Sequence, residues 1–465
     1  MDYSDFLNSK HDYGADEGFA PISLPSFLFD FQASLTDWAI RKGRAAIFAD
    51  CGLGKTPMQL VWADNVVKHT NRPVLILTPL SVSIQTLQEA QKFGIEAKRA
   101  VPGHIDRPLI YVTNYEQLHK FTATDFAGVV CDESSILKNF DGVYKSQITE
   151  FMRQVPYRLL ATATAAPNDW DELGTSSEAL GYLGYKDMLK TFFTNKENSL
   201  SKRRMGRFDM FKGESVDRDA FVLLGWAETP FWRWVASWAR AARKPSDLGF
   251  DDRDFILPPL VEQFTEVKPT KPRDGLLFDI TAINFKEQRE VIRRTITERC
   301  EAAAASIAAH DVAVAWCNLN DEGTLLTKLT GGVEVSGRTS DEEKEEAINW
   351  FVNGADTRRV LVSKPDILGF GMNFQHCAYS TYFSDFSYEK YYQATRRFWR
   401  FGQKRKVTIN NIYPEGGERM MQAIIRKSKA ADEMFANMIA HMNDALGIEK
   451  SHYITKGISK PSWLK

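Results

Sequence analysis

Residues 47–56 of the chain read Ile47-Phe48-Ala49-Asp50-Cys51-Gly52-Leu53-Gly54-Lys55-Thr56. The apolar start predicts a buried strand, the glycines predict a tight turn, and the spacing from Pro57 to Lys68 predicts a helix. Backbone amides in such a turn can surround phosphate oxygens, at the positive end of the helix dipole. We therefore predict a nucleotide cradle formed by Gly52, Leu53 and Gly54. Lys55 would reach the β- and γ-phosphates of ATP, and the Thr56 hydroxyl would bind Mg²⁺.

The simpler alternative, a glycine-rich turn without a ligand, is disfavoured because Gly-Lys-Thr stands where a phosphate loop requires it.

With 465 residues the chain exceeds the size of a single core, so we expect two or three domains. The net charge of −1 does not by itself predict a polyanionic partner. Any contact with nucleic acid must then come from local basic patches.

Cysteine spacing and the N-terminal sequence bear on the cellular compartment. The five cysteines are scattered without close pairs, which argues against structural zinc and disulfides and favours a reducing environment. The N-terminus lacks the basic start and apolar core of a secretion signal. The sequence also lacks an apolar run of about 20 residues, which a membrane span needs. We therefore expect a cytoplasmic protein without a membrane partner.

Short β-rich runs alternate with helical ones after the cradle. We predict strands over residues 74–78, 109–113, 128–131 and 157–161. Buried apolar strands separated by helices indicate a parallel sheet of the α/β class with helices on both faces. Functional residues of such sheets gather at the carboxyl ends of the strands. Polar residues follow each predicted strand, namely Thr78, Thr113, Asn114, Asp132, Glu133, Thr162 and Thr164.

The acidic pair is the most informative of these strand ends. Asp132 can hold Mg²⁺, usually through water, and Glu133 can orient and deprotonate an attacking water. A solvated acidic pair is the alternative, which the preceding phosphate loop disfavours.

Gln32 stands 23 positions before Lys55, and its amide can both donate to and accept from an adenine edge.

The alternation fails from about residue 184 to 260. Between residues 190 and 212 seven bases face two acids, and Lys202, Arg203 and Arg204 lie at the centre of this stretch. Two interpretations stay open, a solvated loop and a surface that contacts nucleic-acid phosphates. Phe231, Trp234 and Trp238 follow at helical spacing, which favours a helix packed on a core over a base-stacking platform.

A second alternating set begins after a linker at residues 257–260 and a long helical pattern over about 284–310. Its predicted strands cover residues 312–316, 333–335, 360–363, 379–383 and 407–412, without a second phosphate loop. Arg397 and Arg400 are three residues apart, so we expect them on one helical face, where they could meet a γ-phosphate held by the first lobe. After Pro414 an amphipathic helix is expected to brace the second lobe, followed by a basic tail.

The order of these motifs resembles that of superfamily-two helicases and translocases, most closely the Swi/Snf-type ATPases in the compact form of bacteria and phages. The resemblance covers about residues 29–175 and 310–413. It depends on the following segments: Asp-Cys-Gly-Leu-Gly-Lys-Thr (50–56), Thr-Pro-Leu-Ser (78–81), Thr-Asn-Tyr-Glu (113–116), Asp-Glu-Ser-Ser (132–135), Gly-Phe-Gly-Met-Asn (369–373), and Gln393-Ala394 through Arg397, Arg400, Gly402 and Gln403. It implies an ATP-driven translocase on duplex DNA, built from two RecA-like lobes that hold ATP between them.

The resemblance also implies individual roles. Catalysis would fall to Lys55, Asp132, Glu133, Arg397 and Arg400, with Mg²⁺ at Thr56 and Asp132. Gln32 would select adenine, and Gln393 would help sense the γ-phosphate. Thr162 and Thr164 would couple hydrolysis to movement. The DNA backbone would be contacted by Thr78, Ser81, Thr113, Asn114, Gly369, Gly371 and Asn373. Three positions depart from the family pattern, at Ser134-Ser135, at Thr162-Ala163-Thr164-Ala165 and at Arg396. None of them removes a group that hydrolysis needs.

The expected domain boundaries follow from these patterns. They are a lead-in over 1–25, a first RecA-like lobe over 26–183, an inserted helical and basic segment over 184–260, a second lobe over 261–415, and a C-terminal helix with a basic tail over 416–465. We expect a monomer. Two other functions remain open, a strand-separating DNA or RNA helicase and a nucleotide-switched DNA-binding module.

Overall fold

The computed structural model describes residues 16–138, 142–166, 170–195, 221–270, 285–369, 372–385 and 387–446. The chain divides into two compact units. Unit 1 comprises residues 1–252 and 431–465, and unit 2 comprises residues 253–430. Of the described residues beyond the expected first lobe, 184–195, 221–252 and 431–446 fall in unit 1.

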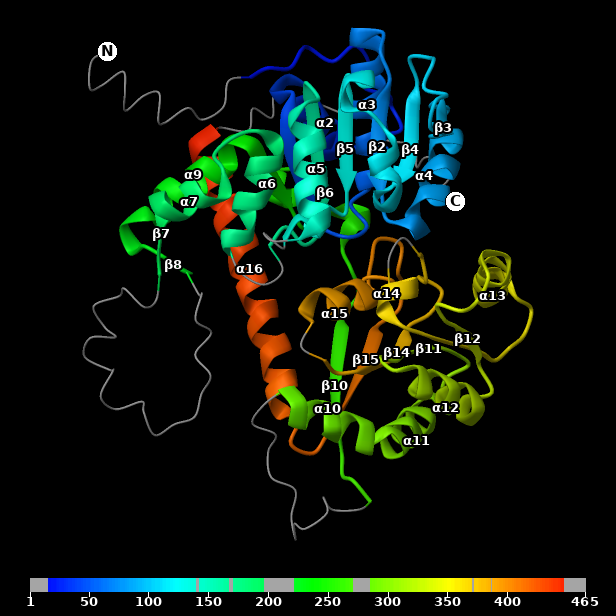
Figure 1. Cartoon of the computed structure of the whole chain (residues 1–465). Coiled ribbons are helices and arrows are strands. Elements are labelled where there is room, and N and C mark those ends of the chain that lie inside the picture. The colour runs from blue at the N-terminus through cyan, green and yellow to red at the C-terminus, as the bar shows by residue number, and fades with distance from the viewer. Residues whose placement is uncertain are drawn as a thin grey trace. The chain divides into compact units, whose positions relative to one another are not determined.

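Unit 1 contains a fully parallel sheet of seven strands (Figure 1). Their order is β3 (Ala97–Arg99), β4 (Ile110–Asn114), β2 (Val74–Thr78), β5 (Gly128–Asp132), β6 (Tyr157–Thr162), β1 (Arg44–Ala49) and β9 (Ala239–Ala242). Apart from the edge strand β3, these strands are almost entirely buried, as expected for apolar strands covered on both faces. The predicted parallel α/β sheet is therefore confirmed.

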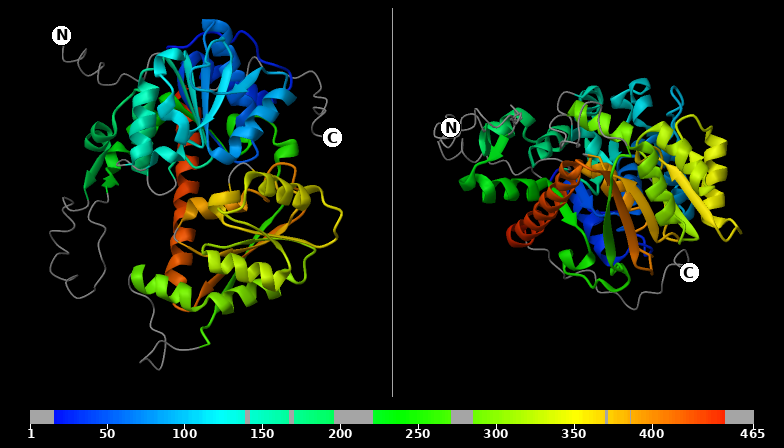
Figure 2. Two further views of the ribbon diagram at one scale, coloured as in Figure 1. Left: turned by 45° about the vertical axis from the view of Figure 1, so that its right-hand side comes forward. Right: turned by 90° about the horizontal axis from the view of Figure 1, so that it is seen from below.

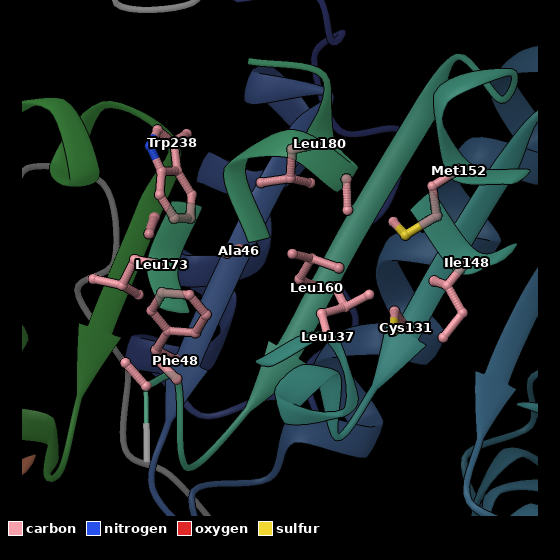
Figure 3. Close-up of a cluster of buried hydrophobic side chains, with 14 of the residues drawn as sticks. Ala46, Phe48, Cys131, Leu137, Ile148, Met152, Leu160, Leu173, Leu180 and Trp238 are labelled. Atoms are coloured by element: carbon pink, nitrogen blue, oxygen red, sulfur yellow. The ribbon is translucent and has the colours of Figure 1, made fainter. Parts of the chain in front are cut away.

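Helices pack on both faces of this sheet. The helices described in unit 1 are α2 (Asp30–Lys42), α3 (Lys55–Thr70), α4 (Leu80–Lys92), α5 (Val143–Arg153), α6 (Leu173–Leu180), α7 (Tyr185–Phe192) and α9 (Glu228–Trp238). Figure 3 shows one of the two interfaces, where Leu160 and Cys131 of the sheet meet Met152 of α5 and Leu180 of α6. Short 3₁₀ turns connect several elements: η1 (Tyr115–Lys120), η2 (Ala123–Asp125), η3 (Ser134–Lys138), η4 (Trp170–Glu172), η7 (Gly225–Ala227) and η8 (Pro245–Leu248) in unit 1, and η9 (Arg253–Phe255) in unit 2.

The segment expected as an insertion is partly built into the first sheet. After the antiparallel pair β7 (Phe193–Asn195) and β8 (Phe221–Leu223), helix α9 leads into β9, which pairs in parallel with β1. The aromatic stripe of α9, Phe231, Trp234 and Trp238, is buried in the core cluster of unit 1, so its predicted packing role is confirmed. The basic residues Lys202, Arg203 and Arg204 lie outside the described residues.

Unit 2 contains a second parallel sheet. Its strands run in the order β10 (Leu260–Val267), β15 (Val407–Pro414), β14 (Tyr379–Phe383), β11 (Val312–Trp316), β13 (Arg359–Ser363) and β12 (Val333–Val335). Its helices are α10 (Phe285–Arg294), α11 (Ile296–Ile307), α12 (Asn320–Thr330), α13 (Asp341–Asn353), α14 (Pro365–Leu368) and α15 (Tyr388–Thr395). Helices α11 and α12 cover one face of the sheet (Figure 2). The structure therefore contains two parallel-sheet lobes in tandem, with the RecA-like arrangement that the sequence predicts.

The last helix, α16 (Glu418–Leu446), is long and amphipathic, as predicted. Its methionines were expected to brace the second lobe, but Met434 and Met438 lie in the core cluster of unit 1. Arg243, just after β9, holds this part of α16 through an ion pair with Asp432 at 2.6 Å and a position 4.7 Å from the centre of the Phe435 ring. In the part of the chain that the structure describes, no helix combines the length and apolarity that a bilayer span requires.

Candidate nucleotide-binding site

The predicted phosphate loop joins β1 to α3. Gly52 and Gly54 have φ angles of 91° and 76°, which lie in the left-handed region that glycine enters most easily. A Cβ atom on Gly54 would lie 2.3 Å from the Gln32 amide nitrogen, so the close approach also requires glycine here. Gly54 caps α3 without a side-chain hydrogen bond. The first amides of α3 are therefore left for an anion, as a phosphate site needs.

The strands on either side hold the loop in shape. The Asp50 amide donates to the Ala242 carbonyl of β9 at 3.0 Å, and the Leu53 amide donates to the Asp50 carbonyl at 3.2 Å. The Lys55 ammonium donates to the Ala49 carbonyl at 3.1 Å. Strand β9, which the sequence analysis did not predict, is thus part of the support of the phosphate loop.

Gln32 contacts the phosphate loop itself. Its side chain is 4% exposed. The amide nitrogen donates to the Leu53 carbonyl at 2.8 Å, and the amide oxygen accepts from the Phe29 amide at 3.0 Å. The structure therefore brings Gln32 next to the phosphate loop, and its contact with adenine stays a prediction.

Asp132 ends strand β5 at the same edge of the sheet. One carboxylate oxygen accepts from the Gln59 amide nitrogen at 2.6 Å, and both side chains are buried. Burial is the main cause that raises the pKa of Asp132, and the Glu133 carboxylate is the second. The hydrogen bond from Gln59 and the charge of Lys55 oppose this rise. Gln59 was missed in the sequence analysis, although it stands four residues after Lys55 and so on the same face of α3.

Glu133 has an unusual backbone conformation. Its φ angle is 51°, in the left-handed region that side chains other than glycine rarely adopt. The Thr162 hydroxyl donates to its carboxylate at 3.4 Å and also accepts from the Thr164 amide at 3.1 Å. The tyrosine of the Thr-Asn-Tyr-Glu segment, Tyr115, donates from its hydroxyl to the Asp132 carbonyl. Sequence reasoning quoted that segment but gave Tyr115 no role.

The predicted DNA-contacting residues of unit 1 lie at neighbouring strand ends. Thr78 ends β2, and its buried hydroxyl has no hydrogen-bond partner among the residues that the structure describes. Thr113 and Asn114 end β4, next to β2 in the sheet. The Asn114 side chain accepts from the Gln117 amide at 3.1 Å, so it also caps η1. Ser81 lies in the first turn of α4.

The arginines of unit 2 do not share a helical face, which corrects the expectation. Helix α15 ends at Thr395, so Arg397 and Arg400 lie in the turns that follow. Their guanidinium groups nevertheless converge, because each donates to the Met372 carbonyl at 3.1 Å. Arg397, 3% exposed, also donates to the carbonyl and the side-chain oxygen of Gln393, at 3.0 Å each.

The remaining candidates belong to the segment that these arginines contact. Gly369 follows the short helix α14, and Asn373 is exposed. Gly371 lies outside the described residues. The Gln393 amide nitrogen is buried without a hydrogen-bond partner in the described parts of the chain.

The residues at the edge of unit 1 fit ATP and Mg²⁺. Uncapped amides, two left-handed glycines and Lys55 suit a chain of phosphates. The Thr56 hydroxyl and the Asp132 carboxylate are hard oxygen ligands of the kind that Mg²⁺ prefers. A divalent cation would also favour the charged form of the Asp132 carboxylate, which burial disfavours.

Comparison with known proteins gives likenesses in structure alone. No family model matches the chain, and no curated protein matches it. The chain is similar in structure to the Sulfolobus solfataricus SWI2/SNF2 ATPase core in complex with dsDNA, at 17% sequence identity and a TM-score of 0.39. The match covers 90% of this chain and 96% of that chain. Because both measures are low, the function proposed below rests on the residues of this chain.

Proposed function

We propose that the protein is an ATP hydrolase that uses the reaction to move along nucleic acid, most of all as a translocase on duplex DNA. The observation that carries the proposal is the contact between Gln59 and Asp132. It joins the helix that begins with Lys55 to the end of β5, so the phosphate loop and the acidic pair belong to one site. A loop and a carboxylate brought together in this way are the parts that phosphoryl transfer to water requires.

Each residue of this site has a task in the proposed reaction. The loop amides and Lys55 bind the β- and γ-phosphates, and Gln32 holds the loop against α2. Thr56 and Asp132 hold Mg²⁺, which, when bound, neutralises charge on the phosphates. Glu133 orients the attacking water and accepts its proton. Thr162 contacts the Glu133 carboxylate, and this places the proposed coupling residues next to the proposed base.

The second unit contributes positive charge in this proposal. Arg397 and Arg400 would neutralise the charge that develops on the γ-phosphate, and Gln393 would hold Arg397 in place. The paired donation to Met372 supports a joint role, since one carbonyl orients both guanidinium groups. Thr78, Ser81, Thr113, Asn114, Gly369, Gly371, Asn373, Lys202, Arg203 and Arg204 are proposed to contact the DNA backbone.

The test compares ATP turnover with duplex DNA, single-stranded DNA, RNA and no polymer. A translocase on duplex DNA is expected to be stimulated most by duplex and to displace a triplex-forming strand from it. Glu133→Gln is the matched control, because it keeps the shape of the side chain and removes the base, and it should abolish turnover. Turnover of Glu133→Gln at the parental rate would contradict the assignment of the base.

The same experiment separates the alternatives. Preferential stimulation by single strands, together with strand separation, would identify a helicase instead. Turnover without displacement of the third strand would identify a nucleotide-switched module that binds DNA without moving along it. Absence of ATP turnover with every polymer would contradict the proposed function itself.

A further inference from the structure

A buried hydrogen-bond network lies beneath the acidic pair. Tyr115 follows β4, whereas Asp132 ends β5, and β2 lies between these two strands in the sheet. The Tyr115 hydroxyl donates to the Asp132 carbonyl and lies 3.2 Å from the Cys131 sulfur. Because the hydroxyl proton is used on the carbonyl, the Cys131 thiol is the donor in the second contact. The network therefore links two strand ends that are not neighbours in the sheet.

Both donors keep their protons throughout the physiological range. Burial is the main cause that raises the pKa of Tyr115 well above its ordinary value, and Cys131 is the second. Burial raises the pKa of Cys131 to about 12. The Tyr115 ring is 4% exposed and packs in the core cluster of unit 1, so the hydroxyl is held in place by the packing of its ring.

The accepting carbonyl belongs to the peptide group whose orientation sets the φ angle of the next residue. The Asp132 carbonyl belongs to the peptide group that ends at the Glu133 nitrogen, and rotation of that group about the N–Cα bond of Glu133 is its φ angle. Glu133 holds φ at 51°, which is unfavourable for a residue with a Cβ atom. Such a conformation persists only where surrounding contacts hold it. The hydroxyl of Tyr115 acts directly on the peptide group concerned.

We infer that Tyr115 is a positioning residue for hydrolysis, which holds the Asp132–Glu133 peptide so that Glu133 stays in the left-handed region and its carboxylate stays beside Thr162. The inference rests on the proposed function, in which Glu133 is the base. It also assigns a task to the Thr-Asn-Tyr-Glu segment besides contact with DNA. Loss of the hydroxyl would allow the peptide to rotate and Glu133 to relax, which moves the carboxylate away from the Thr162 hydroxyl.

The first test removes the hydroxyl and keeps the ring. Tyr115→Phe should lower kcat by about 10- to 100-fold, the range expected when a reacting group is displaced by about 1 Å. The KM for ATP should remain unchanged, because the phosphate loop is not altered. Tyr111→Phe is the matched control, since Tyr111 lies on β4, the strand that Tyr115 follows, and in the same core cluster, but its hydroxyl accepts from the Arg107 amide at 3.4 Å instead. Parental kcat in Tyr115→Phe, or an equal loss in both variants, would overturn the inference.

The second test does not depend on activity. Glycine accepts a positive φ angle and alanine does not, so the melting temperature of Glu133→Gly minus that of Glu133→Ala reports the strain at this position. In the Tyr115→Phe background this difference should fall by about 2–4 °C, because relaxation has already relieved the strain. An unchanged difference would overturn the inference. If the parental chain hydrolyses no ATP, the proposed function fails, while this cycle still decides whether Tyr115 holds the peptide.

Discussion

Strand β1 of unit 1 and strand β11 of unit 2 both lead into a helix, and the two helix N-termini differ. In unit 1 the N-cap of α3 is Gly54, which makes no side-chain hydrogen bond. In unit 2 the buried Glu322 of α12 accepts from the amides of Asn318 and Leu319, at 2.8 and 2.9 Å. The first junction presents its amides to an external anion, whereas the second satisfies amides with a carboxylate of its own.

At the second junction, which we call the closed junction, the charge of Glu322 is also neutralised by an arginine. The Arg299 guanidinium donates to the Glu322 carboxylate at 2.6 Å, and both side chains are at most 2% exposed. The same strand-to-helix junction can thus bind a phosphate or stabilise a fold, depending on whether glycines or an acidic side chain occupy it.

The largest effect on ATP turnover is expected at the junction of β1 and α3, which we call the open junction because Gly54 caps the helix without a side-chain hydrogen bond. Lys55→Ala should leave no measurable ATP turnover, because it removes the cation that meets the β- and γ-phosphates. Steady-state phosphate release measures this loss. Lys68→Ala is the control, since Lys68 lies on the last turn of the same helix, where it pairs with Asp64 at 2.6 Å and donates to the Ser23 hydroxyl at 3.4 Å. Turnover by Lys55→Ala near the parental rate would remove the distinction between the two junctions.

The next largest effect on ATP turnover tests whether the second unit supplies an arginine to the reaction. Arg397→Ala should lower turnover by about 10³-fold, the lower end of the range for arginine fingers. Affinity for a fluorescent ATP analogue should be largely retained, because the loop of unit 1 is intact. Arg405→Ala, at an exposed position after the same segment, should leave turnover unchanged. A loss of affinity as large as the loss of turnover would assign Arg397 to nucleotide binding instead.

The sequence predicted most strands because buried parallel strands are short apolar runs. The predicted ranges for β2, β11, β12 and β14 coincide with those in the structure. Strand β9 was missed, since its sequence, Ala-Arg-Ala-Ala, lacks the β-branched residues that mark a strand. Its pairing with β1 is a tertiary contact that no local pattern reveals.

Within the site, the sequence pointed to the residues that we propose for the chemistry, but not to those that support them. Glycines and the Lys-Thr pair of the phosphate loop form a local pattern whose spacing is itself the signal. Gln59 and Tyr115 act through contacts with Asp132 from other elements, and in each case the contact exists only in the folded chain. The arginines were placed on a helix because spacing alone cannot show that α15 ends at Thr395.

A smaller effect tests the closed junction. Glu322→Ala should destabilise unit 2 by about 3–5 kcal/mol, because it takes the carboxylate away from the buried Arg299 charge. Hydrogen exchange of peptides covering residues 312–330 measures this locally. Replacing both partners, with Arg299→Met and Glu322→Leu together, should recover most of the loss, since no buried charge is then unpaired. A loss below about 1 kcal/mol in the single variant would contradict a closed, charge-paired junction.

The smallest effect concerns the amide that joins the open junction to the acidic pair. Gln59→Met keeps the length of the side chain and removes the donor to Asp132. The Mg²⁺ concentration for half-maximal binding of an ATP analogue should rise about 10-fold, as found when a group that orients a metal ligand is removed. Gln85→Met is the matched control, because Gln85 makes the same type of bond to Glu89, at 3.0 Å, on α4. An unchanged Mg²⁺ requirement in Gln59→Met would show that packing alone orients Asp132, and the contact that joins the phosphate loop to the acidic pair would then be structural.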